Sequence, residues 1–203
     1  RAMSKLRPTA FAPALDAKSR QILADLEFQD TPEVSVSLHG SSFDFPKLKG
    51  EGTLKLGRTA MRGVWIDSAE SPFEIADGAI TYSGFKLIHG KGVGTGTFTY
   101  DFAGQQVRLS NIVSTLNPVD VMMSIDPKIA ESIRPYRFRE NPTVNVDGSV
   151  HMKDIHQNNM RIKIESAEGL DYDLLGKTLS FGKTSASVHI DQAIVRAKVT
   201  RAK

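Results

Sequence analysis

Apolar residues recur at every second position through most of this chain. Clear examples are Val34-x-Val36-x-Leu38, Val107-x-Leu109 and Val144-x-Val146. Successive side chains of an extended strand point to opposite faces, so this period predicts strands with one apolar and one polar face. The same period recurs at Leu54/Leu56, Val64/Ile66, Phe73/Ile75, Phe98/Tyr100/Phe102, Val119/Val121, Ile162/Ile164, Val188/Ile190 and Val195/Ala197/Val199.

Short glycine-containing motifs separate these alternating segments. They are Asp77-Gly78, Ser83-Gly84, Ala103-Gly104 and Gly176-Lys177. Glycine is favoured in tight turns because it reaches positive φ without a steric cost. Strands separated by turns every roughly 8–12 residues are typical of antiparallel meanders. The sequence therefore predicts a mainly β fold built of antiparallel meander sheets.

Two segments depart from this period and predict short α-helices, at 16–26 and 126–134. Asp16 and Asp126 are suitable N-caps, and Pro127 occupies the first helical position, where proline is tolerated. The apolar residues expected to share a helix face are Ile22, Leu23 and Leu26 in the first segment, and Ile129 and Ile133 in the second. Each helix precedes a run of strands.

The chain also repeats itself. The pattern Phe-x-acid-x-Pro-x-Val-x-Val occurs at 28–36 and again at 138–146, an offset of 110 residues. Further matches, at an offset that falls to about 98, pair 52–56 with 148–152, 61–62 with 160–161 and 66–70 with 164–168. The repetition predicts two related units, each a short helix followed by a β-meander, that share a sheet. They are unit 1 at 11–123 and unit 2 at 124–203, the latter read as a truncated copy, after a linker at 1–10 that resembles an artificial junction.

Composition excludes several function classes. Of the 203 residues, 40% are apolar, which is enough for a core. The 26 basic and 23 acidic residues leave a net charge of only +3, too little to predict nucleic-acid binding. The absence of cysteine excludes disulfides, thiol nucleophiles and cysteine-ligated metals. No apolar run approaches the ~18 residues of a membrane-spanning helix.

The glycine run at 90–96 is the most unusual local feature. It lacks the Gly-Lys-Ser/Thr ending of a phosphate loop, and its spacing differs from the dinucleotide fingerprint. Glycines at alternate positions of a strand would leave one face bare for close packing, which we favour, or for a ligand chain. Trp65 lies between two apolar residues and is expected on the wetter face of its strand. The candidate ligand or packing surface is Gly90, Gly92, Gly94, Gly96, Phe98, Tyr100 and Trp65.

Other polar residues favour structural roles. His151 and His156 have neither strand nor helix spacing for a shared metal, and the Asp171-x-Asp173 pair lacks the rest of a calcium loop. A solvated sheet face is the simplest interpretation of the basic residues Lys47, Lys49, Lys55, Arg58 and Arg62, which have few acids nearby in sequence; anionic headgroups are the alternative. We expect no catalytic residue, metal or cofactor.

The order of motifs resembles the C-terminal repeat region of AsmA-like proteins, relatives of TamB and of bridge-like lipid-transfer proteins. The motifs that carry the resemblance are Phe98-Thr99-Tyr100-Asp101, Val107-Arg108-Leu109-Ser110-Asn111, Asn117-Pro118-Val119-Asp120 and the segment 138–148, within a likeness that covers roughly 15–200. The resemblance implies a periplasmic part of a longer, inner-membrane-anchored envelope protein. It also implies a curved antiparallel sheet whose apolar face holds acyl chains, and it brings no catalytic residues.

Two functions follow as expectations. The first is a non-enzymatic envelope segment whose one-faced apolar sheet serves lipid handling or outer-membrane assembly, with phospholipid or another acyl-chain ligand and other envelope proteins as partners. The alternative is a surface-exposed β module for adhesion or for binding carbohydrate or protein, in which Trp65, Tyr172 or a sheet edge would make the contacts. Whether the two short helices close the apolar face or leave a groove is open at this point.

Overall fold

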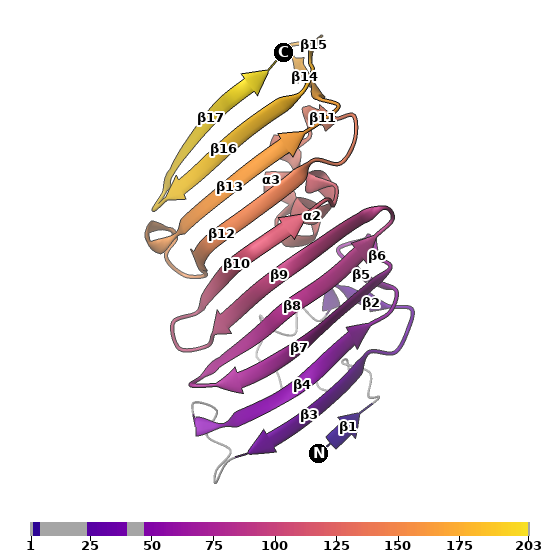
Figure 1. Ribbon diagram of the computed structural model, residues 1–203, viewed down its shortest axis with the longest axis vertical. Helices are drawn as coiled ribbons and strands as arrows, with labels where there is room; N and C mark the ends of the chain where they lie inside the picture. The colour runs from indigo at the N-terminus through magenta and orange to yellow at the C-terminus, as the bar shows by residue number, and fades with distance from the viewer. Residues whose placement is uncertain (1, 5–23, 40–46, 203) are drawn as a thin grey trace.

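Eleven strands form one continuous antiparallel sheet. The computed structural model describes residues 2–4, 24–39 and 47–202. In spatial order the strands are β1 (Ala2–Ser4), β3 (Glu33–His39), β4 (Lys49–Leu56), β7 (Ser68–Ala76), β8 (Ala79–His89), β9 (Gly92–Asp101), β10 (Gln106–Ser114), β12 (Thr143–His151), β13 (Asn159–Ser166), β16 (Thr184–Asp191) and β17 (Ile194–Ala202). The mainly β, antiparallel prediction is confirmed (Figure 1).

Smaller elements lie behind this sheet in the view of Figure 1. One three-stranded sheet contains β2 (Leu26–Phe28), β5 (Thr59–Met61) and β6 (Val64–Ile66), and another contains β11 (Tyr136–Phe138), β14 (Leu170–Leu174) and β15 (Lys177–Phe181). Between the two in sequence come α2 (Pro118–Ile125) and α3 (Pro127–Ile133), and the 3₁₀ turn η3 (Ile155–Gln157) follows β12.

The strand register places the apolar positions in rows across the sheet. One row follows paired residues from β3 to β17, through Val36, Gly52, Phe73, Tyr82, Phe98, Leu109, Gly148, Met160, Ile190 and Val195. Residues paired directly across neighbouring strands project to the same face. The large sheet therefore has one predominantly apolar face. Its other face carries serine, threonine and charged residues, such as Ser37, Glu51 and Glu74 in another row.

The predicted turns are mostly confirmed, with one correction. Asp77 and Gly78 form the β7–β8 turn, with φ of 51° and 72°, and Gly104 lies in the β9–β10 turn. The prediction of a turn at Ser83-Gly84 is wrong. These residues lie inside β8, where the register shifts between Tyr82 and Phe85, because the extra residue is taken up as a bulge.

The second predicted helix is present, and a further helix replaces a predicted strand. Asp126 begins α3, its carboxylate accepting a hydrogen bond from the Lys128 backbone N–H at 2.9 Å. The alternation at Val119/Val121 predicted a strand, and this is wrong because both residues lie in α2. Asn117 caps α2 and Pro118 occupies its first position. These helix-start signals therefore outweigh the alternation of Val119 and Val121, which on its own predicts a strand.

Most of the first predicted helix, 16–23, lies outside the described residues. Its expected last residue, Leu26, belongs to β2 and pairs with Met61 of β5. The prediction is therefore wrong at this end, because a strand partner satisfies the backbone of Leu26.

The strands β2 to β8 of unit 1 have the same order and sheet membership as β11 to β17 of unit 2, whereas β9, β10 and α2 of unit 1 have no counterpart among them. Equivalent hydrogen bonds join the small sheets. Gln29 N donates to Arg58 O at 3.0 Å, and Arg139 N donates to Gly169 O at 3.2 Å. The downstream sequence matches do not follow this correspondence, because 52–56 lies on β4 whereas 148–152 begins on β12. Both units contribute strands to the one large sheet (Figure 1).

Asp126 joins the two helices, because its backbone N–H donates to Met122 O of α2 and its carboxylate caps α3. We predict that Asp126→Ala lowers the free energy of unfolding by about 1 kcal/mol, through loss of the N-cap. Urea denaturation measures this loss. Asp126→Asn keeps an acceptor and is the control; equal destabilisation by both variants would contradict the capping role.

Candidate functional site: the apolar face of the sheet

Many of the described side chains on the apolar face of the large sheet are only partly buried. Among the described residues, the buried apolar side chains are Ala60, Phe73, Leu116, Ala130 and Leu170, together with Pro32 and Pro142. Of these, only Phe73 belongs to a strand of the large sheet. Other members of the apolar rows, such as Tyr82, Phe98 and Leu109, stay partly exposed. A contiguous apolar surface left exposed is typical of a binding surface.

Aromatic rings form the middle of this face. The Tyr82 and Phe98 rings stack with centroids 4.6 Å apart, and Phe73 and Phe85 flank them at 5.7 Å from Tyr82 and 5.9 Å from Phe98. Burial raises the pKa of the Tyr82 hydroxyl above its ordinary value. Such rings offer a large and rigid apolar area at low entropic cost.

The glycine run divides between a turn and this face. Gly90 lies in the β8–β9 turn with φ of 58°, so the expectation that all four glycines share a strand face is wrong for Gly90. Gly92, Gly94 and Gly96 lie on β9. A Cβ on Gly94 would be 3.1 Å from Leu116 Cδ1.

The segment that leaves β10 is held over these glycines. Thr115 N donates to Val93 O at 2.8 Å, and Val93 N donates to Thr115 Oγ1 at 3.0 Å. A Cβ on Gly92 would lie 2.8 Å from Thr115 O and 2.9 Å from Leu116 Cα. The close approach therefore comes from this chain itself, and α2 begins immediately afterwards on the apolar side of the sheet.

Trp65 and the β9 aromatic residues lie in different sheets. Trp65 belongs to β6 of a small sheet, where it is half-buried beneath the Arg58 guanidinium at 5.4 Å from the ring centroid. Phe98 and Tyr100 lie on β9 of the large sheet, and Tyr100 packs edge-on against Phe102 at 4.7 Å. Trp65 therefore does not share a sheet with the β9 residues with which it was grouped.

The structure brings acids to basic residues that lack them in sequence. The register places Lys55 between Glu33 and Glu70 on the polar face. Arg62 Nε donates to the Asp25 carboxylate at 3.1 Å, and its Nη1 donates to the carbonyl oxygen of Ile125 at the end of α2. An arginine at a helix C-terminus satisfies free carbonyls and complements the helix dipole.

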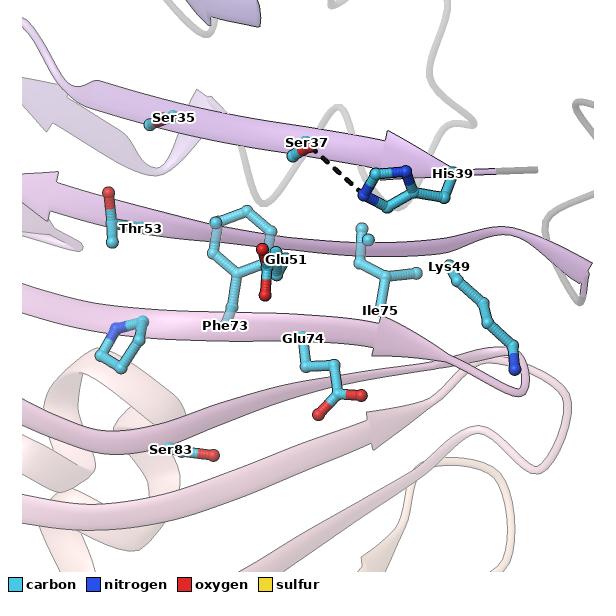
Figure 2. Close-up of a pocket in the computed structure, with 13 residues that line it drawn as sticks. Ser35, Ser37, His39, Lys49, Glu51, Thr53, Phe73, Glu74, Ile75 and Ser83 are labelled. Carbon is cyan, nitrogen blue, oxygen red and sulfur yellow. Dashed lines mark hydrogen bonds between the residues drawn. The ribbon is translucent and has the colours of Figure 1, made fainter. Parts of the chain in front are cut away.

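A shallow hollow of about 870 Å³ lies on the polar side, over β3, β4 and β7 (Figure 2). Ser37 and His39 point toward one another there, with Oγ and Nε2 3.4 Å apart. This is the one hydrogen bond that the described residues provide to the His39 ring. The lining of the hollow also includes Glu51 and Glu74, with Lys49 at the rim.

The two aspartates of β14 are each paired with an arginine, Asp173 with Arg137 of β11 and Asp171 with Arg139, which immediately follows β11. Asp171 lies 2.8 Å from Arg139, and Asp173 lies 2.8 Å from Arg137. The Arg139 hydrogen bond lowers the pKa of Asp171, and the Thr178 hydroxyl, followed by Arg137, lowers the pKa of Asp173. These aspartates stabilise the small sheet.

His151 and His156 lie around η3, where Asp154 accepts hydrogen bonds from His156 N and from the Gln157 side chain. The first of these lowers the pKa of Asp154. In the part of the chain that the structure describes, no three His, Asp or Glu side chains are grouped as metal ligands.

Comparison with known proteins identifies no relative of this chain. The chain matches no family, no curated protein and no solved structure. Within the described residues, no helix is both long enough and apolar enough to cross a membrane.

The glycine packing yields a stability prediction. Gly92→Ala should lower the free energy of unfolding by about 1–3 kcal/mol, because the added Cβ meets backbone atoms of Thr115 and Leu116. Thermal and urea denaturation measure the change. Thr95→Val, on the exposed face of the same strand, should stay within about 0.5 kcal/mol. If both variants unfold alike, the close approach is not a constraint.

The ion pairs yield a titration prediction. Arg139→Gln should raise the pKa of Asp171 toward its ordinary value of 3.8, because its strongest charged donor is removed. In the wild-type protein the lowered pKa means that the stabilisation is present above the unfolded pKa and is lost as the pH falls through the folded pKa. Carboxyl-carbon NMR measures the midpoint. Arg108→Gln, on the large sheet, is the control and should leave it unchanged.

Proposed function

We propose that this chain is a non-enzymatic segment of a bacterial cell-envelope protein whose apolar sheet face holds lipid acyl chains. The observation that carries the proposal is the apolar face itself. Its rows extend across the sheet from β3 to β17, yet most of their side chains remain partly exposed. Such a face must be covered by protein or by an apolar ligand.

An acyl chain matches this surface chemically. Burial of apolar groups is favourable by about 0.8 kcal/mol per methylene, so a ligand laid across several strands gains substantial affinity without any polar contact. The Tyr82–Phe98 stack supplies a flat apolar floor. The helices α2 and α3 lie on the same side and cover part of the face, so they would limit where a ligand can lie (Figure 1).

The envelope location rests on the sequence resemblance to AsmA-like proteins. On this proposal the chain is a periplasmic part of a longer protein anchored in the inner membrane, and its partners are phospholipid and other envelope proteins. The alternative, an adhesive or carbohydrate-binding module, has less support from the two rings it would use. Trp65 lies beneath Arg58, and Tyr172 packs against Tyr136 with centroids 4.6 Å apart.

Site-specific photocrosslinking tests the proposal. A photoreactive amino acid placed at Leu109 or at Val195, on the apolar face, should form phospholipid adducts after expression in the periplasm of a Gram-negative host. The same residue at the adjacent positions Arg108 and Arg196, on the polar face, should form few. Mass spectrometry identifies the adducts, and at least fivefold more lipid adduct is expected from the apolar positions, because only these contact the acyl chain.

Each adjacent pair controls for depth in the sheet and for expression, because its two members differ in the face to which they project. Equal adduct formation from both faces, or protein adducts alone at Leu109 and Val195, would overturn the acyl-chain proposal. Binding to a glycan array without co-purified phospholipid would favour the adhesive alternative.

A further inference from the structure

The helix α2 lies on the apolar side of the large sheet without a fully buried side chain (Figure 1). Its residues, 118–125, are mostly apolar, yet each of them remains partly exposed. Among the described elements, its main neighbours are α3 and β6. Burial of an apolar stripe is the usual force that holds a helix on a protein core. Because α2 buries little of its surface, other contacts must fix its position.

The C-terminal end of α2 is held by an arginine of unit 1. Arg62 Nη1 donates hydrogen bonds to the carbonyl oxygens of Ser124, at 3.4 Å, and of Ile125. Its Nε donates to the carboxylate of Asp25 at 3.1 Å, immediately before β2. The last carbonyls of a helix have no partner inside the helix, and a cation at this end also complements the helix dipole. Arg62 thus joins α2 to the small sheet of unit 1.

A second polar contact holds the first turn of α2. Asp120 Oδ2 lies 3.5 Å from Nε2 of His89, the last residue of β8. The chain on either side of α2 is fixed more firmly, since Leu116 before it is 8% exposed and Ala130 of α3 after it is 0% exposed. The helix α2 is therefore a loosely packed segment between two buried anchors.

Arg62 has a backbone conformation that arginine does not favour. It lies in the β5–β6 turn with φ of 50°, followed by Gly63 with φ of 77°. Two-residue hairpin turns with positive φ favour asparagine and glycine. The corresponding β14–β15 turn of unit 2, Leu175-Gly176, has φ of 49° and 77° without an arginine. The turn geometry alone does not explain Arg62, whereas its contacts with Asp25 and α2 do.

The segment that enters α2 borders the aromatic part of the apolar face. A Cβ on Gly94 would lie 3.1 Å from Leu116 and 3.9 Å from the Phe85 ring. Phe85 in turn packs edge-on against Phe98 at 5.9 Å, and Phe98 stacks on Tyr82. An acyl chain laid on this stack would therefore meet the α2 segment at this end of the strands.

We propose that α2 is a lid on the acyl-chain site and that Arg62 is its latch, a positioning residue that holds the lid in place. This inference rests on the proposed acyl-chain function. When the Arg62 contacts break, α2 moves away from the end of β8 while Leu116 and α3 stay anchored. The movement uncovers apolar area beside the aromatic stack, and ligand entry at this end requires it. Local opening of this kind draws on the least buried parts of a fold.

Hydrogen exchange of the α2 amides measures the latch directly. The amides to follow are Val121, which donates to Asn117 O, and Asp126, which donates to Met122 O. Arg62→Asn should speed their exchange by about tenfold, the loss expected for hydrogen bonds from a charged donor. Asparagine suits the positive φ of the turn, so a role of Arg62 in the turn alone predicts no faster exchange.

Two further variants accompany this measurement. Arg62→Lys keeps the charge but lacks the planar fork that reaches Asp25 and α2 together, so it should give a smaller increase, and it serves if Arg62→Asn does not fold. Arg137→Asn is the matched control. It removes an exposed ion pair with Asp173 in the small sheet of unit 2 and should leave α2 exchange unchanged.

A cleavable crosslink tests the gating of the acyl-chain site. The chain has no cysteine, so Arg62→Cys/Ile125→Cys places thiols only at the latch. The probe is a pyrene-labelled phospholipid in phosphatidylcholine vesicles, whose loss of excimer emission measures loading. The free double variant should load about tenfold faster than the wild type. The same protein joined by a disulfide-containing bismaleimide should load no faster than the wild type, and reduction of the crosslink should restore fast loading.

Failure of the lid and failure of the acyl-chain function give different results. Unchanged α2 exchange in both Arg62→Asn and Arg62→Lys would overturn the latch, and loading that is the same with and without the crosslink would overturn the lid. If no form of the protein takes up the probe, the acyl-chain function itself is overturned, and the gating role with it.

Discussion

One constraint governs this molecule: the large sheet keeps its apolar and polar positions in register across strand after strand. A shift by one residue in any strand would move its apolar set to the opposite face. The pairings from Val36 to Val195 avoid such a shift even where bulges interrupt β8 and β10, since the rows resume beyond each bulge. An uninterrupted apolar face therefore results from local pairing repeated many times, and no central core is needed to define it.

A large sheet with one apolar face needs other elements to cover that face. Beside a sheet of eleven strands, few apolar side chains of the described residues are buried, namely Ala60, Phe73, Leu116, Ala130 and Leu170 with the prolines Pro32 and Pro142. Arg62 shows how the few covering elements are held, since it joins the β5–β6 hairpin to the end of α2 through polar contacts. Hydrogen bonds thus fix the position of these covering elements, while many described side chains of the apolar face stay partly exposed.

Much of the fold could be predicted from the sequence because strands with one wet face have a period of two. The same signal misled at Val119/Val121, where Asn117 and Pro118 start a helix, and at Ser83-Gly84, where a bulge has the composition of a turn. The candidate surface was harder to predict. Glycine spacing identified the close approach on β9, but its partner, Leu116, comes from the segment after β10, and nothing in the local sequence predicts that return. Trp65 lies in a small sheet although its neighbours alternate like those of the large sheet.

The apolar and polar faces of the sheet have different physical roles. Apolar rows give affinity without selecting for a sequence, since any chain of methylenes gains free energy by covering them. Charged rows contribute little free energy at an exposed surface, and they favour unlike over like neighbours only modestly. At β17 the apolar and polar rows lie side by side, with Val195 and Arg196 adjacent in the chain.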